Sequence, residues 1–420
     1  MSHPRRAGVV FLMVLLSVMT YIDRIIISIA GPGIMKEFNI SEIQMGTVYF
    51  AYFLSYTIMM IPGGYFADVF GPRKALAAMA FGSALLTALT ALGGSPGLGT
   101  YIGIVPSFLV VRLAMGVCAA PMYPSSGRMN ANWNPPSARA RVWGWIACGA
   151  GIGGACTPLL VSWMRANYTW RGSFYLAALA SVVLGAVWYW YARDYPHDEM
   201  PVGASKSLAR TPWKELLTNR DLMLLTAGYF TVNYFEYIFF FWLYYYFGQI
   251  RKMGMDQSAY YTTLMWIAWI VMTPIGGWLS DRFITRFGMK NGRRIVPVAG
   301  LTVSAILVYI GCNVTGTVAT VTLLCLSLGV AASTDGPYWA AAIDAGGRHS
   351  GTGGAIFNTG GNLGGMLAPV VTPLIASWAG WSAGLYAGGA VALIGVSVWF
   401  FIGAEPSVRA RATAAPEPVL

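Results

Sequence analysis

Twelve apolar stretches, each long enough to cross a lipid bilayer, constrain the fold of this chain more than any other feature. A transmembrane helix needs roughly 20 consecutive, mostly apolar residues. Such stretches are predicted at 7–31, 43–66, 75–95, 101–127, 142–163, 172–192, 222–248, 259–279, 295–313, 317–343, 351–376 and 382–403. The composition agrees, since 56% of the residues are hydrophobic, 10% are charged and the mean hydropathy is +0.57. We therefore expect an all-α membrane protein with twelve transmembrane helices.

The placement of the basic residues predicts how these helices are oriented. The formal net charge of +11 is by itself compatible with a nucleic-acid partner. With the N-terminus in the cytoplasm, however, most Lys and Arg residues fall in cytoplasmic loops, as Arg73, Lys74, Arg293 and Arg294 do. Arginine also outnumbers lysine, which favours a bacterial source. We expect an integral protein of the bacterial inner membrane, surrounded by lipid, with both termini cytoplasmic and no nucleic-acid partner.

The chain contains an internal repeat. GGYFADVFGPRK at 63–74 returns as GGWLSDRFITRFGMKNGRR at 276–294, and the offset of 276 − 63 = 213 is close to half of the 420 residues. Parallel six-helix repeats with a substrate site at their interface are a known transporter architecture. The predicted organisation is an N-terminal six-helix bundle at 1–192, a cytoplasmic linker at 193–221, a C-terminal six-helix bundle at 222–403 and a cytoplasmic tail at 404–420.

The first copy of this repeat, GGYFADVFGPRK, resembles the loop signature of the major facilitator superfamily. Other stretches resemble its anion:cation symporter branch, which includes galactonate, glucarate, hexuronate and phthalate transporters and sialin: YIDR at 21–24, RLAMG at 112–116, TWRGSFY at 169–175, GPYWAAAID at 336–344 and FNTGGNLGG at 357–365. The resemblance spans the whole chain. It implies two pseudo-symmetric six-helix bundles and secondary active transport of a small organic anion, such as a sugar acid or an aromatic acid, by alternating access and proton symport.

Both copies of the repeat place a carboxylate beside cations at the cytoplasmic end of a helix. Asp68 precedes Arg73 by five residues, and Asp281 is adjacent to Arg282. Such pairs can hold the cytoplasmic face shut and release it, so we predict a gating role for these four residues. The alternative is a set of static surface ion pairs, each worth less than about 1 kcal/mol.

Arg24 and Arg112 lie within predicted membrane helices at comparable depth. A charged side chain there costs at least a few kcal/mol, so such a residue marks a functional site by default. A planar guanidinium matches a carboxylate with two parallel hydrogen bonds. In the family that the chain resembles, the equivalent arginines contact the acid group of the substrate, and we predict that role for both. The alternative is that each arginine neutralises a buried acid, such as Asp23 or Glu236.

Six further side chains are predicted to contact the substrate around these arginines. Aromatic residues supply stacking and hydroxyl contacts, and two asparagines four residues apart on one helix face supply hydrogen bonds. They are Tyr56, Tyr237, Trp242, Trp339, Asn358 and Asn362. For each aromatic residue, simple packing is the alternative.

The usual proton-coupling glutamate of the family is missing from this chain. The family usually has a glutamate seven residues after the second arginine, whereas Ala119 occupies that position here. Asp23, Glu236 and Asp335 remain as carboxylates within predicted helices. Because desolvation favours the neutral form of a carboxylate, these groups suit reversible protonation, and we predict that they couple transport to protons. Glu236 as a permanent counter-ion of one arginine stays an open alternative.

Nothing in the sequence predicts catalysis, a cofactor or a metal site. GGSPG at 93–97 lacks the strand that precedes a nucleophile elbow, and GAGIGG at 149–154 falls inside a predicted membrane helix, where small residues allow close packing. His3, His197 and His349 lie at helix ends or in tails. We expect a monomeric transporter rather than an enzyme. The alternatives are a proton-independent uniporter or anion exchanger, which Ala119 favours, and a non-transporting membrane receptor.

Overall fold

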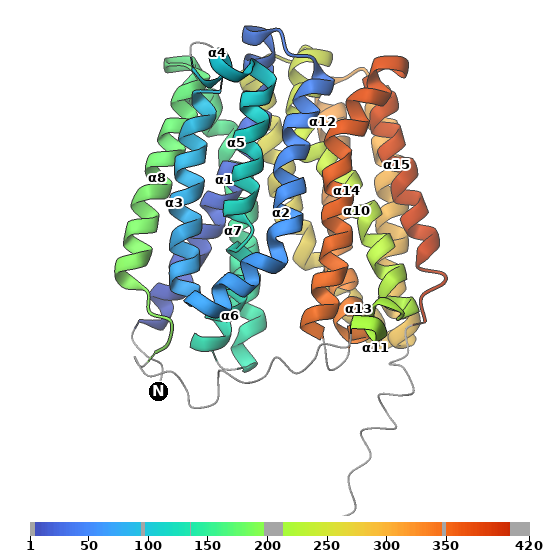
Figure 1. Cartoon of the computed structure of the whole chain (residues 1–420). Helices are drawn as coiled ribbons and strands as arrows, with labels where there is room; N and C mark the ends of the chain where they lie inside the picture. The colour runs from blue at the N-terminus through green and yellow to red at the C-terminus, as the bar shows by residue number, and fades with distance from the viewer. Residues whose placement is uncertain (1–4, 94–96, 135, 197–212, 347–349, 404–420) are drawn as a thin grey trace, which may run out of the picture. The chain divides into compact units, whose positions relative to one another are not determined.

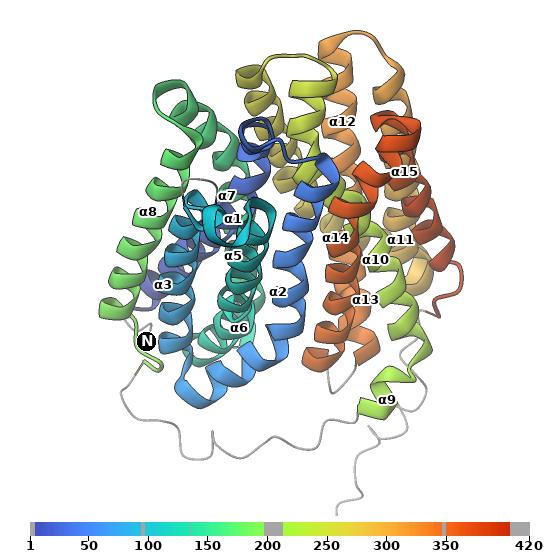
Figure 2. The same cartoon turned by 45° about the horizontal axis from the view of Figure 1, so that its top comes forward.

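The computed structural model describes residues 5–93, 97–134, 136–196, 213–346 and 350–403, and within these ranges every regular element is a helix (Figures 1 and 2). The elements in chain order are α1 Arg6–Phe38, α2 Glu42–Phe70, α3 Pro72–Ala91, α4 Leu98–Ile102, α5 Ile104–Ala119, α6 Met122–Trp133, α7 Pro136–Asn167, α8 Trp170–Tyr191, α9 Trp213–Leu217, α10 Arg220–Tyr245, the π-helix η1 Tyr246–Ile250, α11 Met255–Asn313, α12 Thr317–Ala332, α13 Asp335–Gly346, α14 Ser350–Ala379 and α15 Trp381–Val398.

The predicted membrane spans all coincide with helices. Within the described ranges, nine helical stretches are long and apolar enough to cross a membrane. One of them, α11, contains two predicted spans, because Gly288 with φ of 78° interrupts the helix between them. The helices α2 and α10 cover the two remaining spans. The prediction of an all-α protein with twelve membrane helices is therefore confirmed.

The fourth and tenth predicted spans are each broken in the structure, although the sequence predicts them as continuous. The breaks lie at 120–121, between α5 and α6, and at 333–334, between α12 and α13. Pro121 directly precedes α6 and Pro337 lies in the first turn of α13, which are positions where a missing backbone N–H is tolerated. The two breaks differ by 333 − 120 = 213 residues, so the internal repeat of the sequence is also a repeat of backbone geometry.

Each break packs against a glycine of the repeated motif. A methyl group added at Gly63 on α2 would lie 3.0 Å from the backbone nitrogen of Pro121. A methyl group added at Gly276 on α11 would overlap the carbonyl oxygen of Ser333. Because glycine has no Cβ, it allows this close backbone approach. The same contact therefore recurs in both copies of the repeat.

By the contacts between its residues, the chain divides into two compact units. Unit 1 contains Met1–Ser205, Phe239–Ile267 and Pro369–Ser377, and unit 2 contains Lys206–Ile238, Ala268–Ala368 and Trp378–Leu420. These units do not follow chain order alone, since two segments from the second half of the sequence belong to unit 1. The division into two six-helix bundles at 193–221 stays a prediction.

Unit 1 is held together by helix packing around an apolar core. In this unit α1 packs against α7 and α8, and α2 packs against α5 and α6. The helix α3 packs against α5 and α8, and α8 lies beside α3 in both views (Figures 1 and 2). Trp266, in a segment from the second half of the sequence, stacks on Phe240 with ring centroids 4.3 Å apart and meets Tyr21 edge-on at 6.1 Å. Helices from both halves of the sequence thus share one core.

Substituting Gly276 with alanine is expected to destabilise the protein, because the new methyl group would overlap the backbone of Ser333. Overpacking of this kind costs about 1–3 kcal/mol. Gly277→Ala is the matched control, since a methyl group there meets nothing within 4 Å. Thermal unfolding of the purified variants should show a lower Tm for Gly276→Ala alone. Equal Tm values for the two variants would contradict the close approach described here.

Candidate functional site

Arg24 and Arg112 come together in unit 1, where both pack against the ring of Tyr52. Arg24 on α1 is 3% exposed and Arg112 on α5 is fully buried. Their Cζ atoms lie 5.4 and 4.6 Å from the centroid of the Tyr52 ring. The ring face of an aromatic residue attracts a cation within this distance. Two buried guanidiniums therefore share one aromatic ring.

Three more rings surround the guanidinium of Arg24. Its Cζ lies 4.8 Å from the ring centroids of Tyr21 and Tyr56 and 5.3 Å from that of Phe53. Its Nε donates a hydrogen bond of 3.4 Å to the Tyr52 hydroxyl. Tyr52 and Tyr56 stack with centroids 5.7 Å apart, as expected for residues four apart on one helix face. The predicted site residue Tyr56 thus lies beside Arg24.

The close approach of α2 and α5 places Tyr52 against Arg112. A methyl group added at Gly116, one turn after Arg112, would overlap the Ser55 hydroxyl and the carbonyl oxygen of Tyr52. The sequence analysis identified Tyr56 but missed Tyr52. The signal that would have found it is the spacing of Tyr52 and Tyr56 on one face of α2, together with a glycine on α5 that allows the helices to meet.

The hydrogen bonds of Arg112 go to groups that carry no charge. Its Nη1 donates to the carbonyl oxygen of Asp23 at 3.4 Å and contacts the Met115 sulfur at 3.1 Å, and its Nη2 donates to the carbonyl oxygen of Arg24 at 3.3 Å. Its Nε has no hydrogen-bond partner among the described residues. Arg112 makes no ion pair with any residue that the structure describes, so its positive charge is available to an anion.

Asp23 is also buried, but its carboxylate is bonded to hydroxyl groups on other helices. Thr87 on α3 donates to Oδ1 at 3.1 Å, and Ser181 on α8 donates to Oδ2 at 3.2 Å. Adjacent residues on a helix point about 100° apart. The carboxylate of Asp23 and the guanidinium of Arg24 accordingly contact different neighbours.

Unit 2 contains two buried carboxylates, Glu236 on α10 and Asp335 at the first residue of α13. They are 3% and 8% exposed, and their charges are close enough to interact. Trp269 on α11 donates to Oε1 of Glu236 at 3.3 Å, whereas Oδ1 of Asp335 has no hydrogen-bond partner among the described residues. The break before α13 places Asp335 at a helix N-terminus, where the helix dipole favours a negative charge. The sequence predicted Asp335 inside a continuous helix.

Glu236 occupies the position of Asp23 in the second copy of the repeat, since 236 − 23 = 213. The neighbouring arginine is not repeated, because the residue equivalent to Arg24 is Tyr237. A buried acid therefore recurs in both copies, while the cation occurs only in the first.

The remaining predicted site residues are divided between the two units. In unit 2, Trp339 donates to the Tyr229 hydroxyl at 3.2 Å, and Tyr237 packs against Gly365 of α14. Also in unit 2, Asn362 is buried and Asn358 is half-buried on α14. In unit 1, Trp242 donates to the carbonyl oxygen of Pro369 at 3.1 Å, a contact typical of packing.

Asp68 and Arg73 lie at the adjoining ends of α2 and α3, whereas Asp281 and Arg282 lie within α11, before its interruption at Gly288. The side chain of Asp68 lies outside the described residues. Arg73 donates through Nε to the carbonyl oxygen of Tyr189 at 3.1 Å, and its Cζ lies 4.4 Å from that ring. Asp281 and Arg282 are exposed, and Arg282 lies over the ring of Trp278. The sequence analysis missed an ion pair in unit 2 between Arg293 on α11 and Asp344 on α13.

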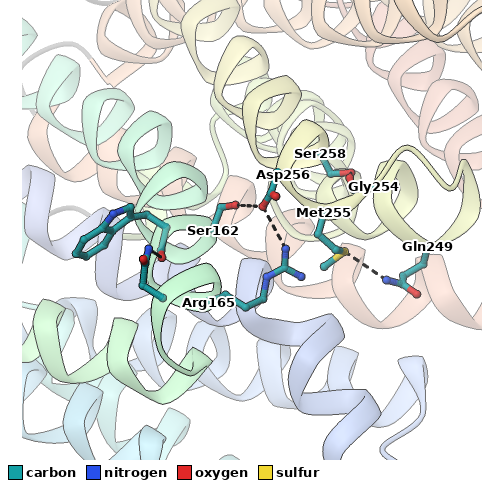
Figure 3. A network of polar contacts seen from close by, with 9 residues as sticks. Ser162, Arg165, Gln249, Gly254, Met255, Asp256 and Ser258 are labelled. Atoms are coloured by element: carbon teal, nitrogen blue, oxygen red, sulfur yellow. Dashed lines mark hydrogen bonds and ion pairs between the residues drawn. The ribbon is translucent and has the colours of Figure 1, made fainter.

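At the end of unit 1 that is predicted to face outside, α7 is bonded to the first turn of α11. Figure 3 shows Ser162 and Arg165 reaching the same carboxylate oxygen of Asp256, at 2.6 and 3.4 Å. These contacts join segments from both halves of the sequence within one unit.

Glu37, at the same end, bonds α1 to α8. Trp170 donates to its Oε2 at 2.6 Å, and Arg171 donates to its Oε1 at 2.7 Å. Partial burial acts to raise the pKa of Glu37, but these hydrogen bonds and the charge of Arg171 outweigh it and hold the pKa below the usual value of 4.5. Both donors belong to the TWRGSFY stretch of the sequence.

Buried cations and acids within membrane helices mark a functional site. The chain belongs to the Major Facilitator Superfamily, whose family model matches residues 13–366. It is therefore an integral membrane transport protein and not an enzyme.

Named relatives agree with this assignment. The chain is 30% identical over 374 residues to a probable sulfoacetate transporter of Cupriavidus necator, covering 86% of this chain and 84% of that protein. It is 26% identical over 405 residues to the hexuronate transporter of Bacillus subtilis, covering 94% of each. A bacterial homologue of the human lysosomal transporter Spinster, solved in an inward-facing and unoccupied conformation, has the same fold, with a TM-score of 0.79, 15% identity and full coverage of both chains. The predicted major facilitator fold and the resemblance to organic-anion transporters are confirmed.

Substituting Glu37 with glutamine should lower the Tm at pH 7, because the charge-assisted hydrogen bond from Arg171 is lost. A lowered pKa stabilises the fold above the ordinary pKa, and this contribution disappears as the pH falls through the lowered value. The difference in Tm between wild type and Glu37→Gln should therefore shrink as the pH falls below 4.5. Glu215→Gln, at an exposed glutamate, is the control. A difference that is constant from pH 7 to pH 3 would argue against the contact.

Proposed function

We propose that this protein is a secondary active transporter of a small organic anion, a carboxylate such as a sugar acid or an aromatic acid, which it symports with protons by alternating access. The observation that carries this proposal is the pair Arg24 and Arg112 packed against Tyr52, with Arg112 hydrogen-bonded to no carboxylate. The names of the relatives support the same substrate class, since sulfoacetate and hexuronate both carry acid groups.

The energetics of the arginine pair favour an anionic ligand. Removing a guanidinium from water costs several kcal/mol, and each cation–π contact returns about 0.5–2 kcal/mol. A carboxylate that accepts two parallel hydrogen bonds supplies an opposite charge for Arg112, whose hydrogen bonds go to uncharged groups. In this proposal Arg24 and Arg112 hold the acid group, and Tyr56 stacks beside it. The substrate contacts assigned to Tyr237, Trp242, Trp339, Asn358 and Asn362 stay predictions from the sequence.

The buried carboxylates support the coupling part of the proposal. Asp23 and Glu236 occupy equivalent repeat positions, and Asp335 is close enough to interact with Glu236. The hydroxyls of Thr87 and Ser181 can donate to a carboxylate or accept from a carboxylic acid. The surroundings of Asp23 thus suit both protonation states without a change of geometry.

Alternating access requires gates at both ends of the molecule. We assign the cytoplasmic gate to Asp68, Arg73, Asp281 and Arg282, on the strength of their repeated motif. At the opposite end, the bonds from α7 to Asp256 within unit 1 have to open during the cycle. We further propose that the protein is a monomer in the bacterial inner membrane. The distribution of basic residues favours a cytoplasmic location for both termini.

A second candidate function is proton-independent uniport or anion exchange. Ala119 favours this second candidate. It is a buried, apolar residue at the end of α5, at the position where the family usually has a glutamate. The coupling experiment below separates the two candidates.

Arg24→Ala and Arg112→Ala should each abolish binding of the anion while leaving the protein folded. Removing one partner of a buried charge pair costs about 3–5 kcal/mol, which is roughly two orders of magnitude or more in Kd. Arg112→Lys should not restore binding, because an ammonium lacks the planar fork. Calorimetry with a panel of sugar acids, aromatic acids and sulfonates measures the effect. The exposed residue Arg220 provides the control, Arg220→Ala. Affinity like that of wild type in either buried variant would overturn the assignment.

Asp23→Asn and Glu236→Gln test the coupling to protons. If either carboxylate carries the proton, the neutral variant should bind the anion but lose its accumulation in proteoliposomes under an inward proton gradient. A protonophore should abolish accumulation by the wild type. Accumulation by both variants would show that neither residue is the carrier, and a wild type that ignores the gradient would favour uniport or exchange.

A further inference from the structure

A pocket lies in unit 1 at the end that is predicted to face outside. Its volume is about 280 Å³, and a cavity of about 150 Å³ is already enough for benzene. Residues of α1, α7, the start of α8 and the first residue of α11 line it. Along α1 the lining runs from Glu37 to Ile29, which is about two helical turns. The pocket therefore has room for an aromatic ring with a substituent.

The charges that line this pocket do not cancel. The charged residues of the lining are Glu37, Arg165 and Arg171. Both Nη atoms of Arg171 donate to the carboxylate of Glu37, at 3.2 and 2.7 Å, so these two charges neutralise each other. The charge of Arg165 is left over, and the pocket as a whole favours an anion.

Arg165 is only weakly engaged by its own acid. A guanidinium has five N–H donors, yet among the described residues Arg165 makes one hydrogen bond, of 3.4 Å from Nη2 to Oδ1 of Asp256 (Figure 3). The side chain of Asp256 is 80% exposed, and Ser162 donates to the same oxygen at 2.6 Å. Exposed ion pairs of this kind contribute little to stability. A carboxylate that enters the pocket can therefore displace Asp256 from Arg165.

The rest of the lining is mostly apolar. Ile29, Val161 and Trp170 contribute buried side chains, and Met255 contributes a half-buried one. Such a surface binds an apolar body, but it offers few partners to the hydroxyl groups of a sugar, and a polar group that leaves water without a partner costs free energy. The pocket therefore favours an acid with an aromatic ring over a sugar acid.

We propose that this pocket is a second, peripheral binding site for an organic anion, a carboxylate attached to an aromatic ring, with Arg165 as its anchor. The ring lies against Ile29, Val161 and Met255. The anion and Asp256 compete for Arg165, so a bound anion weakens the bond between α7 and α11. That the anion thereby helps the outer end to open rests on the proposed function, whereas its binding does not.

Calorimetric titration of benzoate into the purified full-length Arg112→Ala variant tests the site, because the arginine pair is broken in that variant. We expect saturable binding of benzoate. Benzamide has the ring without the charge, and glucuronate has the charge without the ring, so both should bind about tenfold more weakly or worse.

Two substitutions in the Arg112→Ala variant should act in opposite directions. Arg165→Gln should weaken benzoate binding about tenfold or more, as loss of a hydrogen bond to a charged group does. Asp256→Asn should tighten it by about two- to fivefold, because it removes the competing charge. The same two substitutions in the wild type should shift the benzoate affinity in the same directions, which tests the site even if Arg112→Ala is unstable.

Lys252→Gln is the matched control. Lys252 is exposed, lies four residues before Asp256 and does not line the pocket, so its substitution should leave the benzoate affinity unchanged. Equal affinities for benzoate and benzamide would mean that the pocket takes apolar molecules such as lipid chains. No benzoate binding, or an affinity that Arg165→Gln does not change, would also overturn the proposal. Benzoate binding at this pocket in a protein that transports no anion would instead overturn only the proposed function.

Discussion

The cost of burying charge in apolar surroundings governs the first copy of the repeat. Arg24 and Arg112 both pack against the ring of Tyr52, and Arg112 also donates to two backbone carbonyl oxygens. Such contacts stabilise a guanidinium without cancelling its charge. The fold thus keeps two cations in the protein interior, and the charge of Arg112 is what makes an organic anion the natural ligand in our proposal.

The direction of the Asp23 side chain is equally important. Because neighbouring residues on a helix diverge by about 100°, one turn of α1 serves two different environments. Arg24 points to the aromatic residues of α2, and Asp23 points to the hydroxyls of α3 and α8. Separate environments on one helix turn keep the buried acid and the buried cation apart. This arrangement underlies the proposed symport.

The two copies of the repeat share a scaffold but differ in charge. The helix breaks at 120–121 and 333–334 and the glycine contacts at Gly63 and Gly276 follow the same offset of 213 residues. The buried acid follows it too, yet the arginine of the first copy is replaced by Tyr237. The backbone geometry is therefore repeated where helices meet, while the side chains around the buried acids differ between the copies. The second copy holds two interacting acids, Glu236 and Asp335.

The sequence by itself determined the twelve helices, the repeat and the choice of Arg24 and Arg112, because hydropathy, spacing and charge are properties of single segments. Only the tertiary structure decided that both arginines share Tyr52, that two spans are broken, and that Thr87 and Ser181 donate to Asp23. These features depend on which helix faces meet and how closely. Small residues such as Gly116 set that distance, and their effect is invisible until the partner helix is in place.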